Sequence, residues 1–477
     1  MSPTPPDRSE IPSVLDAVAR AAGEYLAGVG DRPVRSPDAE DAAASFGGDL
    51  PADGIGAAAT IAELIAGLDG AIHSAGPRFF HFVNGGVTPA ALGADWLTSA
   101  IDQNAGAWVS TPLGAHLEVV ALRWLRDLFG LPPSWGGVLT TGATMANFVG
   151  LACARRWWGL QHGVDVDEQG GGGLPAMPIF GSGYVHPSDQ KAVAMLGLGR
   201  ANVRMLTRDA VGRLDLEALG SALRDLGGAP AVVIGSAGEV NAGDFDPIAR
   251  MADLCERHGA WFHVDGAFGL FAGLAPRSAH LIEGVARADS VIADGHKWLN
   301  VPYDCGFAFV KDASLQPQVF ARTAAYLPEV DTVRPSWGYL GPEMSRRARG
   351  IDVWATLRAY GRSGYRAIVE MHLDLAQRLA SAVDAAADLE RLADVPLNIV
   401  CFRARPPGVA EDRLDELNRR VGEAVLVDGR VFFGSTVYDG KVAFRPAPVN
   451  WRNGPEDIDL IVEVTRELGA KAAADMG

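Results

Sequence analysis

The stretch Ser290-Val291-Ile292-Ala293-Asp294-Gly295-His296-Lys297-Trp298-Leu299 carries a lysine just beyond a short apolar run. The run from Ser290 to Ala293 predicts a buried β-strand, and Lys297 lies in the turn that follows it. Lysine is rarely buried without a function, and burial lowers the pKa of an amine and makes it a usable nucleophile. The stretch therefore predicts a lysine that forms a Schiff base, against the alternative of a surface lysine in an ordinary loop.

A second segment, Gly137–Asn147, has the pattern of a strand, a turn of small residues and a helix. Small residues let backbone N–H groups approach an anion, and the N-terminus of a helix adds positive potential. Thr144 adds a hydroxyl donor, so this segment predicts a phosphate cradle. An ordinary strand-to-helix turn capped by a threonine is the alternative.

Two further polar side chains follow predicted strands. An imidazole at His186 can stack on a flat aromatic cofactor and take part in proton transfer. The alternative is a histidine in the capping region of a helix that has no role in a site. Asp265 ends an apolar strand, where a carboxylate can keep a pyridine nitrogen protonated and so create an electron sink. Ala267 is small enough to lie against the other face of such a ring. A capping aspartate, or a catalytic or metal-binding aspartate of another α/β enzyme, is the alternative for Asp265.

Short apolar runs alternate with helical patterns through the middle of the chain, which predicts a mostly parallel sheet covered on both faces. The predicted strands are Gly137 to Thr140, Met177 to Val185, Asn202 to Leu206, Ala231 to Gly235, Ala260 to Val264, Ser290 to Ala293 and Gly306 to Val310. The anion turn, the histidine, the aspartate and the lysine each follow one of these strands. Ligands gather at the carboxyl ends of strands in open α/β sheets, so the four features are expected in one crevice.

The regions on either side of this sheet differ in character. An amphipathic helix is predicted over residues 11–26, and the Gly-, Ala- and Asp-rich residues 30–60 read as a loose connection. Beyond Pro342 the sequence predicts a smaller α+β domain. Its expected elements are long helices over Ser345–Ala387, a strand at Asn398–Arg403, a helix through Leu414 and Val421, a hairpin over Val431–Val449 turned by Asp439-Gly440, and a last helix after Pro455.

These segments together resemble the group II pyridoxal 5′-phosphate (PLP) decarboxylases, which include aromatic amino acid and glutamate decarboxylases. The resemblance runs from about Gly76 to Leu357 and more weakly to the C-terminus; Ser345–Arg349 and Trp354 resemble the segment that leads into the small domain. It implies the PLP-dependent transferase type I fold, with an N-terminal helical layer matching residues 9–28. The expected division is an N-terminal arm (1–75), a large PLP-binding α/β domain (76–341) and a small α+β domain (342–477).

The same resemblance implies an enzyme, a carboxy-lyase that converts an L-amino acid to its amine and carbon dioxide through an external aldimine and a quinonoid. Lys297 is then the residue of the internal aldimine, Asp265 pairs with the pyridine nitrogen and His186 stacks on the ring. The phosphate would be held by Gly142, Ala143, Thr144 and His296. The family is an obligate homodimer with active sites at the subunit interface.

A tyrosine on a mobile loop is the usual proton donor of the family and reaches into the neighbouring subunit. Tyr339 is the better-placed candidate here and Tyr326 is the other, with a structural tyrosine as the alternative. Phe80, His81 and Trp108 are candidates for the substrate pocket, with core packing as the alternative. Arg445, on the predicted hairpin, is a candidate to bind a substrate carboxylate, with a structural ion pair as the alternative.

Three features depart from the family's pattern. Glu239 and Val240 stand where paired threonines are common in the animal aromatic decarboxylases. Asp294 stands where an asparagine is frequent, and repulsion from the phosphate argues against its direct contact with that group. The stretch Arg78–Asn84, expected at the substrate entrance, differs from the aromatic-specific pattern.

The resemblance implies a small amino acid as the partner, and composition argues against other classes of partner. The formal net charge of -16 argues against nucleic acid and anionic membranes as partners. No apolar run reaches the length of a membrane span, and Met1–Arg8 lacks the pattern of a signal peptide. The four cysteines form no CxxC pair, which favours reduced thiols and a cytoplasmic location. The histidines show no HxxxH or HExxH spacing, so no metal is expected.

Other chemistries fit the same residues. An aminotransferase, a C–S lyase or a decarboxylating aldehyde synthase would use the same fold and the same lysine. A protein that binds PLP without catalysis is a further alternative, which the complete set of lysine, aspartate and histidine argues against.

Overall fold

The computed structural model describes residues 7–321 and 334–476 of the chain. A seven-stranded sheet forms its centre, with the strand order β1-β7-β6-β5-β4-β2-β3. The strands are β1 (Gly136–Thr140), β2 (Ile179–Gly181), β3 (Val203–Met205), β4 (Val232–Ser236), β5 (Trp261–Asp265), β6 (Ser290–Asp294) and β7 (Gly306–Val310). β7 runs antiparallel to both of its neighbours and the other pairs are parallel, which confirms the predicted mostly parallel sheet.

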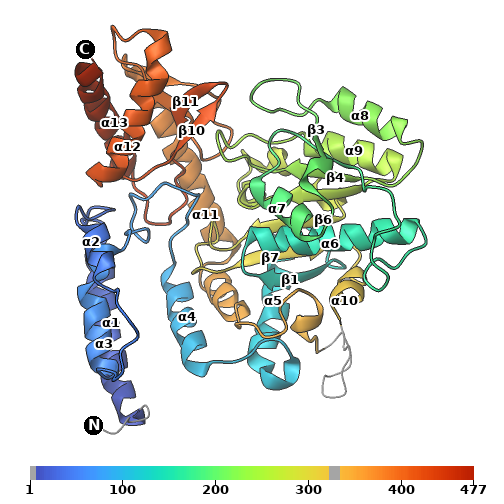
Figure 1. The fold of residues 1–477 in the computed structure, drawn as a ribbon, viewed down its shortest axis with the longest axis horizontal. Coiled ribbons are helices and arrows are strands. Elements are labelled where there is room, and N and C mark those ends of the chain that lie inside the picture. Colours follow the sequence, from blue (N-terminus) through green and yellow to red (C-terminus); the bar gives the residue numbers. More distant parts are fainter. Residues whose placement is uncertain (1–6, 322–333, 477) are drawn as a thin grey trace.

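Helices cover both faces of this sheet (Figure 1). They include α5 (Pro112–Leu128), α6 (Ala143–Gln161), α7 (Pro187–Met195), α8 (Leu216–Asp225), α9 (Ile248–His258) and α10 (Leu315–Phe320). Helix α4 (Pro89–Ile101) packs instead on the long helix over Gly350–Ala385. All residues of β4, β5, β6 and β7 are buried, which explains why these strands read as continuous apolar runs.

The alternation of side chains along β5 positions Asp265. Trp261 meets Trp157 of α6, His263 lies against Gly150 of the same helix, and Asp265 accepts a hydrogen bond from Asn147. Because side chains two residues apart share one face of a strand, all three point towards α6. Phe262 points to the opposite face, where it packs near Ile248 of α9.

The C-terminal domain holds a second core. Its antiparallel sheet has the order β10-β11-β9-β8. The elements are α11 (Gly350–Ala385), β8 (Leu389–Arg391), β9 (Phe402–Ala404), α12 (Leu414–Asp428), β10 (Ser435–Tyr438), β11 (Lys441–Phe444) and α13 (Pro455–Met476). The long helix α11 is interrupted at Gly361, whose φ of 59° lies in the left-handed region that glycine tolerates.

The predicted hairpin is present, and Asp439 and Gly440 turn it with φ values of 48° and 74°, as a type I′ turn requires. The strand expected at Asn398–Arg403 is wrong in its bounds, because only Phe402–Ala404 joins the sheet. The residues before it are buried but bond to a loop instead; the Asn398 side chain donates to the carbonyl of Pro448.

The N-terminal arm contains α1 (Ile11–Gly28), α2 (Ala39–Ala44) and α3 (Ala57–Ala66). The loose connection expected over residues 30–60 is therefore wrong, since alanine-rich stretches within it are helical. Figure 1 shows α1 and α3 side by side at the edge of the molecule. Neither helix has a buried residue.

The segment just after this arm belongs to the C-terminal core. Phe79 forms a bridge with Phe432, and Phe80 is 1% exposed in a cluster with Val431 and Phe433. The chain thus crosses to the C-terminal domain before it enters the large domain.

Within residues 7–321 and 334–476, no helix has the length and apolar character needed to cross a bilayer. The same residues contain no group of three His, Cys, Asp or Glu side chains placed to hold a metal ion. All four cysteines are buried and unpaired.

Candidate active site

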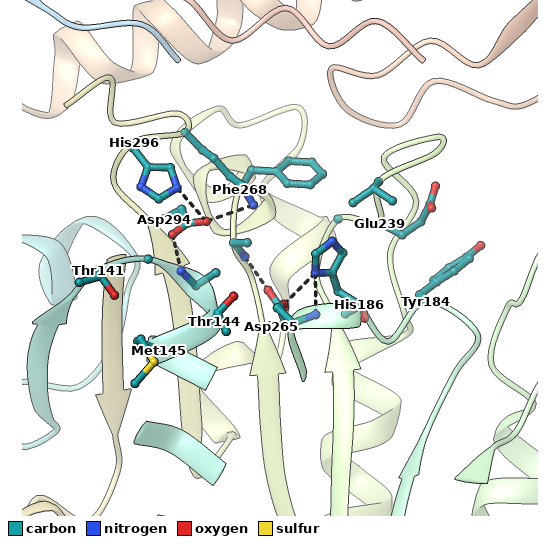
Figure 2. A pocket seen from close by; sticks show the side chains of 18 residues that line it. Thr141, Thr144, Met145, Tyr184, His186, Glu239, Asp265, Phe268, Asp294 and His296 are labelled. Atoms are coloured by element: carbon teal, nitrogen blue, oxygen red, sulfur yellow. Dashed lines mark hydrogen bonds and ion pairs between the residues drawn. The ribbon is translucent and has the colours of Figure 1, made fainter. Parts of the chain in front are cut away.

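A cavity of about 220 Å³ lies at the carboxyl ends of the parallel strands (Figure 2). The turns after β1, β2, β4, β5 and β6 all reach it, because parallel strands end at the same edge of a sheet. Its lining residues are Thr141, Gly142, Ala143, Thr144, Met145, Tyr184, His186, Ser188, Ser236, Gly238, Glu239, Val240, Asp265, Ala267, Phe268, Asp294, His296 and Lys297. The cradle, the histidine, the aspartate and the lysine of the sequence prediction thus meet in one place.

Lys297 lies in the turn after β6, and its side chain is 16% exposed. Its Nζ lies 3.1 Å from Asp294 Oδ2 and 5.9 Å from the ring centre of Phe268. Gly85 packs on the backbone here, and a Cβ at Gly85 would come within 1.7 Å of the Lys297 carbonyl oxygen. The next residue, Trp298, is fully buried and donates to His372 of α11 at 2.8 Å, which anchors the turn.

Asp265 ends β5 at the floor of the cavity. Its Oδ1 accepts from the Ala267 N–H at 3.0 Å, and its Oδ2 accepts from Asn147 Nδ2 at 3.1 Å. The same Asn147 accepts through Oδ1 from His263 Nε2 at 3.0 Å. His263 Nδ1 lies 2.7 Å from the hydroxyl of Ser290. A buried chain of donors therefore fixes the carboxylate.

His186 caps α7 from the side of the cavity opposite the lysine turn. The Ser188 N–H donates to His186 Nδ1 at 3.2 Å, and the Ser188 hydroxyl lies 2.7 Å from the same atom. Because Nδ1 accepts, the proton of the neutral ring is on Nε2. Burial lowers the pKa of His186, and the charges of Lys297 and Arg445 add to this effect against the opposing charge of Asp265.

The predicted cradle is the N-terminus of α6. Gly142 is the N-cap residue, has a φ of 142° and offers no capping side chain of its own. A Cβ at Gly142 would lie 3.0 Å from His296 Cε1, and a Cβ at Gly306 would lie 2.5 Å from the Gly142 backbone. Small residues are therefore required here so that the backbone can approach whatever occupies the cavity.

Asp294 pairs with three groups around this cradle. Its Oδ1 accepts from the Ala143 N–H at 2.6 Å, and its Oδ2 lies 3.5 Å from His296 Nε2 as well as near Lys297. Burial alone would raise the pKa of Asp294, but Lys297 and His296 favour the charged carboxylate, so this pKa is lowered. His296 is itself fixed, since it accepts from the Cys305 N–H and stacks on Tyr303 at 4.2 Å.

The lining residues fit a PLP molecule at both of its polar ends. A helix N-terminus at the cavity, with Thr144 and His296 beside it, suits a phosphate. A fixed carboxylate, Asp265, suits a protonated ring nitrogen. Lys297 supplies an amine in the same cavity.

Other predicted site residues do not line this cavity. Phe80 is buried in the C-terminal core, and Tyr339 is only 3% exposed, with its backbone beside Ser336 and Trp337. Both side chains are buried in the described part of the chain, and neither lines this cavity. Tyr326 lies outside the described residues. Trp108 is half-buried, with its ring edge-on to His116.

Arg445 lies close to the wall of the cavity and His81 lies near Arg445, but neither residue lines the cavity. Arg445 donates to the carbonyl of Val240 at 3.0 Å and forms no ion pair with any residue of the described segments. The alternative of a structural ion pair therefore has no support there. Burial, with the charge of Arg445, lowers the pKa of His81 to about 4. Glu239 is bonded to its own loop, because its carboxylate accepts from the N–H groups of Asn241 and Ala242.

Sequence reasoning missed several residues that shape the site. Asn147 and His263 orient Asp265, Ser188 orients His186, and Phe268 lies beneath Lys297. A signal for His263 was present, because a histidine two residues before Asp265 in an apolar strand must share its face. Nothing local indicated Phe268.

The sequence matches the profile of the pyridoxal-dependent decarboxylase conserved domain over residues 61–405. It is 31% identical to the L-2,4-diaminobutyrate decarboxylase of Rhizobium meliloti (strain 1021), with 88% of this chain and 84% of the relative covered. It is 28% identical to the aromatic-L-amino-acid decarboxylase of Bacillus atrophaeus, with 83% and 82% covered. The structure is similar to a crystal structure of mouse CSAD, with a TM-score of 0.89, 25% identity, and 97% and 99% of the two chains covered.

Proposed function

Because this chain belongs to the pyridoxal-dependent decarboxylase family, we propose that Lys297, Asp265 and His186 are the residues through which it uses its cofactor. The chain is a PLP-dependent amino acid decarboxylase, a carboxy-lyase that releases carbon dioxide from an amino acid and leaves the amine. One observation supports the residue assignment above all others. The three side chains and the N-terminus of α6 line a single cavity.

When bound, PLP supplies an aldehyde that takes up the substrate amine and a protonated ring that accepts the electrons of the breaking bond. Lys297 would hold it through the amine. Gly142, Ala143 and Thr144 would hold its phosphate with the N-terminal amides of α6, with His296 alongside. Asp265 would hold the proton on the ring nitrogen, because its two oxygens are already fixed by Ala267 and Asn147.

His186 contributes a flat, neutral ring with its Nε2–H free to donate. Ser188 occupies Nδ1, so the ring cannot turn over without losing two contacts. We propose that His186 stacks on the cofactor and that Ala267 lies against the opposite face. Both residues line the cavity, and the small side chain of Ala267 leaves room there.

Arg445 is proposed to bind a carboxylate of the substrate. Its guanidinium is partly buried near Val240 on the cavity wall and has one side-chain hydrogen bond among the described residues, to a carbonyl. A partly buried cation with unused donors is costly to maintain without an anionic partner, and a substrate carboxylate would provide one. Replacement by methionine is expected to raise the KM for the amino acid more than it lowers kcat.

We further propose a homodimer with active sites at the subunit interface, in the cytoplasm. Helices α1 and α3 of the N-terminal arm bury no side chain of their own, which supports a role in covering a second copy. Trp108 is half-buried, next to Val109 at 78% exposure, and such a position suits a contribution to the partner's cavity. Unpaired cysteines are consistent with a reducing compartment.

Lys297→Ala tests the assignment directly. The variant should bind PLP without the visible absorbance of a covalent imine and should release no carbon dioxide from any amino acid. Borohydride reduction followed by peptide mass spectrometry should locate the cofactor on Lys297 in the wild type. Lys311→Ala is the control, because this exposed lysine lies outside the cavity. Covalent PLP and turnover in Lys297→Ala would end the proposal.

A panel of L-amino acids tests the substrate and the outcome of the reaction. The panel should contain aromatic, acidic and diamino side chains, and both carbon dioxide and the organic product should be measured. The amine is expected. An aldehyde or a keto acid in its place would assign the chain to one of the other reactions that the same fold supports.

A further inference from the structure

Asp189 is a buried carboxyl group that the proposed function does not use. It lies in the first turn of α7, three residues after His186, and is 0% exposed. Neither of its oxygens has a hydrogen-bond donor in good geometry among the described residues, although the backbone amides of His186 and Asp189 lie nearby. Buried carboxylates are normally paired, so this one requires an explanation.

The groups that surround Asp189 offer no counter-charge. His263 Nε2 lies 3.8 Å away, but its proton is donated to Asn147 Oδ1. Burial lowers the pKa of His263 to about 4, so this ring is neutral. The other close group is the carboxyl of Asp265, whose charge bears on Asp189. Asn147 holds the two segments together, because its Nδ2 lies 3.1 Å from Asp265 Oδ2 and 3.3 Å from the hydroxyl of Ser188, the residue before Asp189.

Two carboxyl groups that interact in this way share a proton, because two buried like charges repel strongly. The hydrogen bonds decide which of the two carries it. Asp265 accepts from the Ala267 N–H and from Asn147 Nδ2, as an ionised carboxylate does. Asp189 has no such donors.

We infer that Asp189 is a positioning residue for Asp265, a neutral carboxylic acid that donates a hydrogen bond to the Asp265 carboxylate. The inference rests on the proposed role of Asp265 at the ring nitrogen of the cofactor. Burial, reinforced by the charge of Asp265, raises the pKa of Asp189 well above its usual range. The pair then carries one negative charge at neutral pH and a second only when Asp189 ionises.

Other titratable groups face the pair from each neighbouring element. His186 leads into α7, His263 lies on β5, and Lys297 and Asp294 lie across the cavity. Of the four, Lys297 and Asp294 pair with each other, with Nζ 3.1 Å from Oδ2. Ionisation of Asp189 would therefore add an unpaired charge next to the ring nitrogen at alkaline pH.

Infrared spectroscopy of the PLP-loaded enzyme tests the protonation state. At about pH 7 the wild type should show the C=O band of an un-ionised carboxylic acid that is missing from Asp189→Asn. Asparagine keeps the shape and an N–H donor, so this variant should fold and bind PLP. An unchanged carboxylic acid band would show that Asp189 is ionised and would overturn the inference.

Titration of the visible absorbance of bound PLP tests the coupling to the cofactor. Asp189→Asn should lose the alkaline spectral transition or shift it by about one pH unit or more. Asp189→Leu removes the donor and should weaken PLP binding about tenfold. Asp352→Asn is the matched control, because Asp352 is also a buried carboxyl, with a pKa raised to about 7 by burial, but lies on α11 away from the cavity. Absorbance and affinity unchanged in both Asp189 variants would overturn the inference.

A separate experiment shows whether the proposed role of Asp265 fails. Unchanged PLP affinity in Asp265→Ala would contradict that role, whatever the infrared spectrum of Asp189→Asn shows.

Discussion

At the scale of the residue, one carboxylate ties the proposed cofactor lysine to the phosphate cradle. Asp294 lies 3.1 Å from Lys297 Nζ and accepts from the Ala143 N–H at the start of α6. The sequence argued against direct contact between this carboxylate and a bound phosphate. In the structure, Asp294 accepts a hydrogen bond from one of the backbone amides that a phosphate would use. The Asp294 carboxylate and the phosphate therefore compete for the same donors.

Asp294→Asn is therefore expected to bind PLP more tightly. The amide removes the repulsion between Asp294 and the phosphate and frees Lys297 from its ion pair. The expected gain is about tenfold in affinity, or about 1.4 kcal/mol. Fluorescence titration of the apoprotein with PLP measures it. Glu239→Gln serves as the control, because that buried carboxylate lines the same cavity but bonds to its own loop. Weaker binding in Asp294→Asn would contradict the competition.

At the scale of the element, β1 shows how an edge strand of the sheet is completed by side chains. The Leu139 N–H donates to Glu118 of α5 at 3.0 Å, and the Leu139 carbonyl accepts from Arg346 at 2.6 Å. Arg346 also contacts both Glu118 oxygens, at 2.9 and 2.8 Å, and both side chains are buried. One ion pair thus satisfies both backbone groups of Leu139, in the strand that leads into the cradle.

Arg346→Met should destabilise the protein by about 3–5 kcal/mol, since it leaves Glu118 buried and unpaired. The double variant Glu118→Gln/Arg346→Met should recover part of this loss, because glutamine keeps an acceptor for Leu139 without a charge. Chemical denaturation followed by circular dichroism measures both. Arg347→Met is the control, as its pair with Asp95 is partly exposed and should contribute less than about 1 kcal/mol. A double variant as unstable as the sum of its parts would refute this account.

At the scale of the whole molecule, apolar side chains remain exposed on α1 of the N-terminal arm and on α4. Ile11 and Leu15 on α1 are each 57% exposed, and Leu97 on α4 is 64% exposed. An amphipathic helix of 18 residues with no buried side chain is unstable alone, so it needs a surface to cover. A second copy of the chain offers such a surface, in line with the proposed homodimer.

Leu15→Asp should shift the protein from dimer to monomer and reduce turnover with it. Sedimentation velocity at about micromolar concentration measures the association state. Ser13→Asp, also exposed on α1, adds the same charge without removing an apolar side chain and should leave the dimer intact. A wild-type chain that sediments as a monomer while fully active would exclude the interface.

Much of the large domain could be predicted because its strands are short apolar runs separated by helical patterns. Lys297, His186, Asp265 and the α6 cradle follow such runs, and parallel strands bring their carboxyl ends together. The hairpin at Asp439 could also be predicted, because the type of its turn depends on two neighbouring residues. The position of Phe80 could not be predicted, because the sequence pattern of an apolar residue is the same whether it lines a pocket or packs in a core.

The sequence by itself determined which residues end the strands and therefore which chemistry the cavity holds. Only the tertiary structure decided what surrounds them. Asn147 and Asp265 lie 118 residues apart in the chain yet share a hydrogen bond, and the interaction of Asp189 with Asp265 likewise joins α7 to β5. The physical reason is that periodicity fixes the side of an element on which a side chain lies, whereas packing of distant elements fixes its partner, and with it the charge that a buried group can carry.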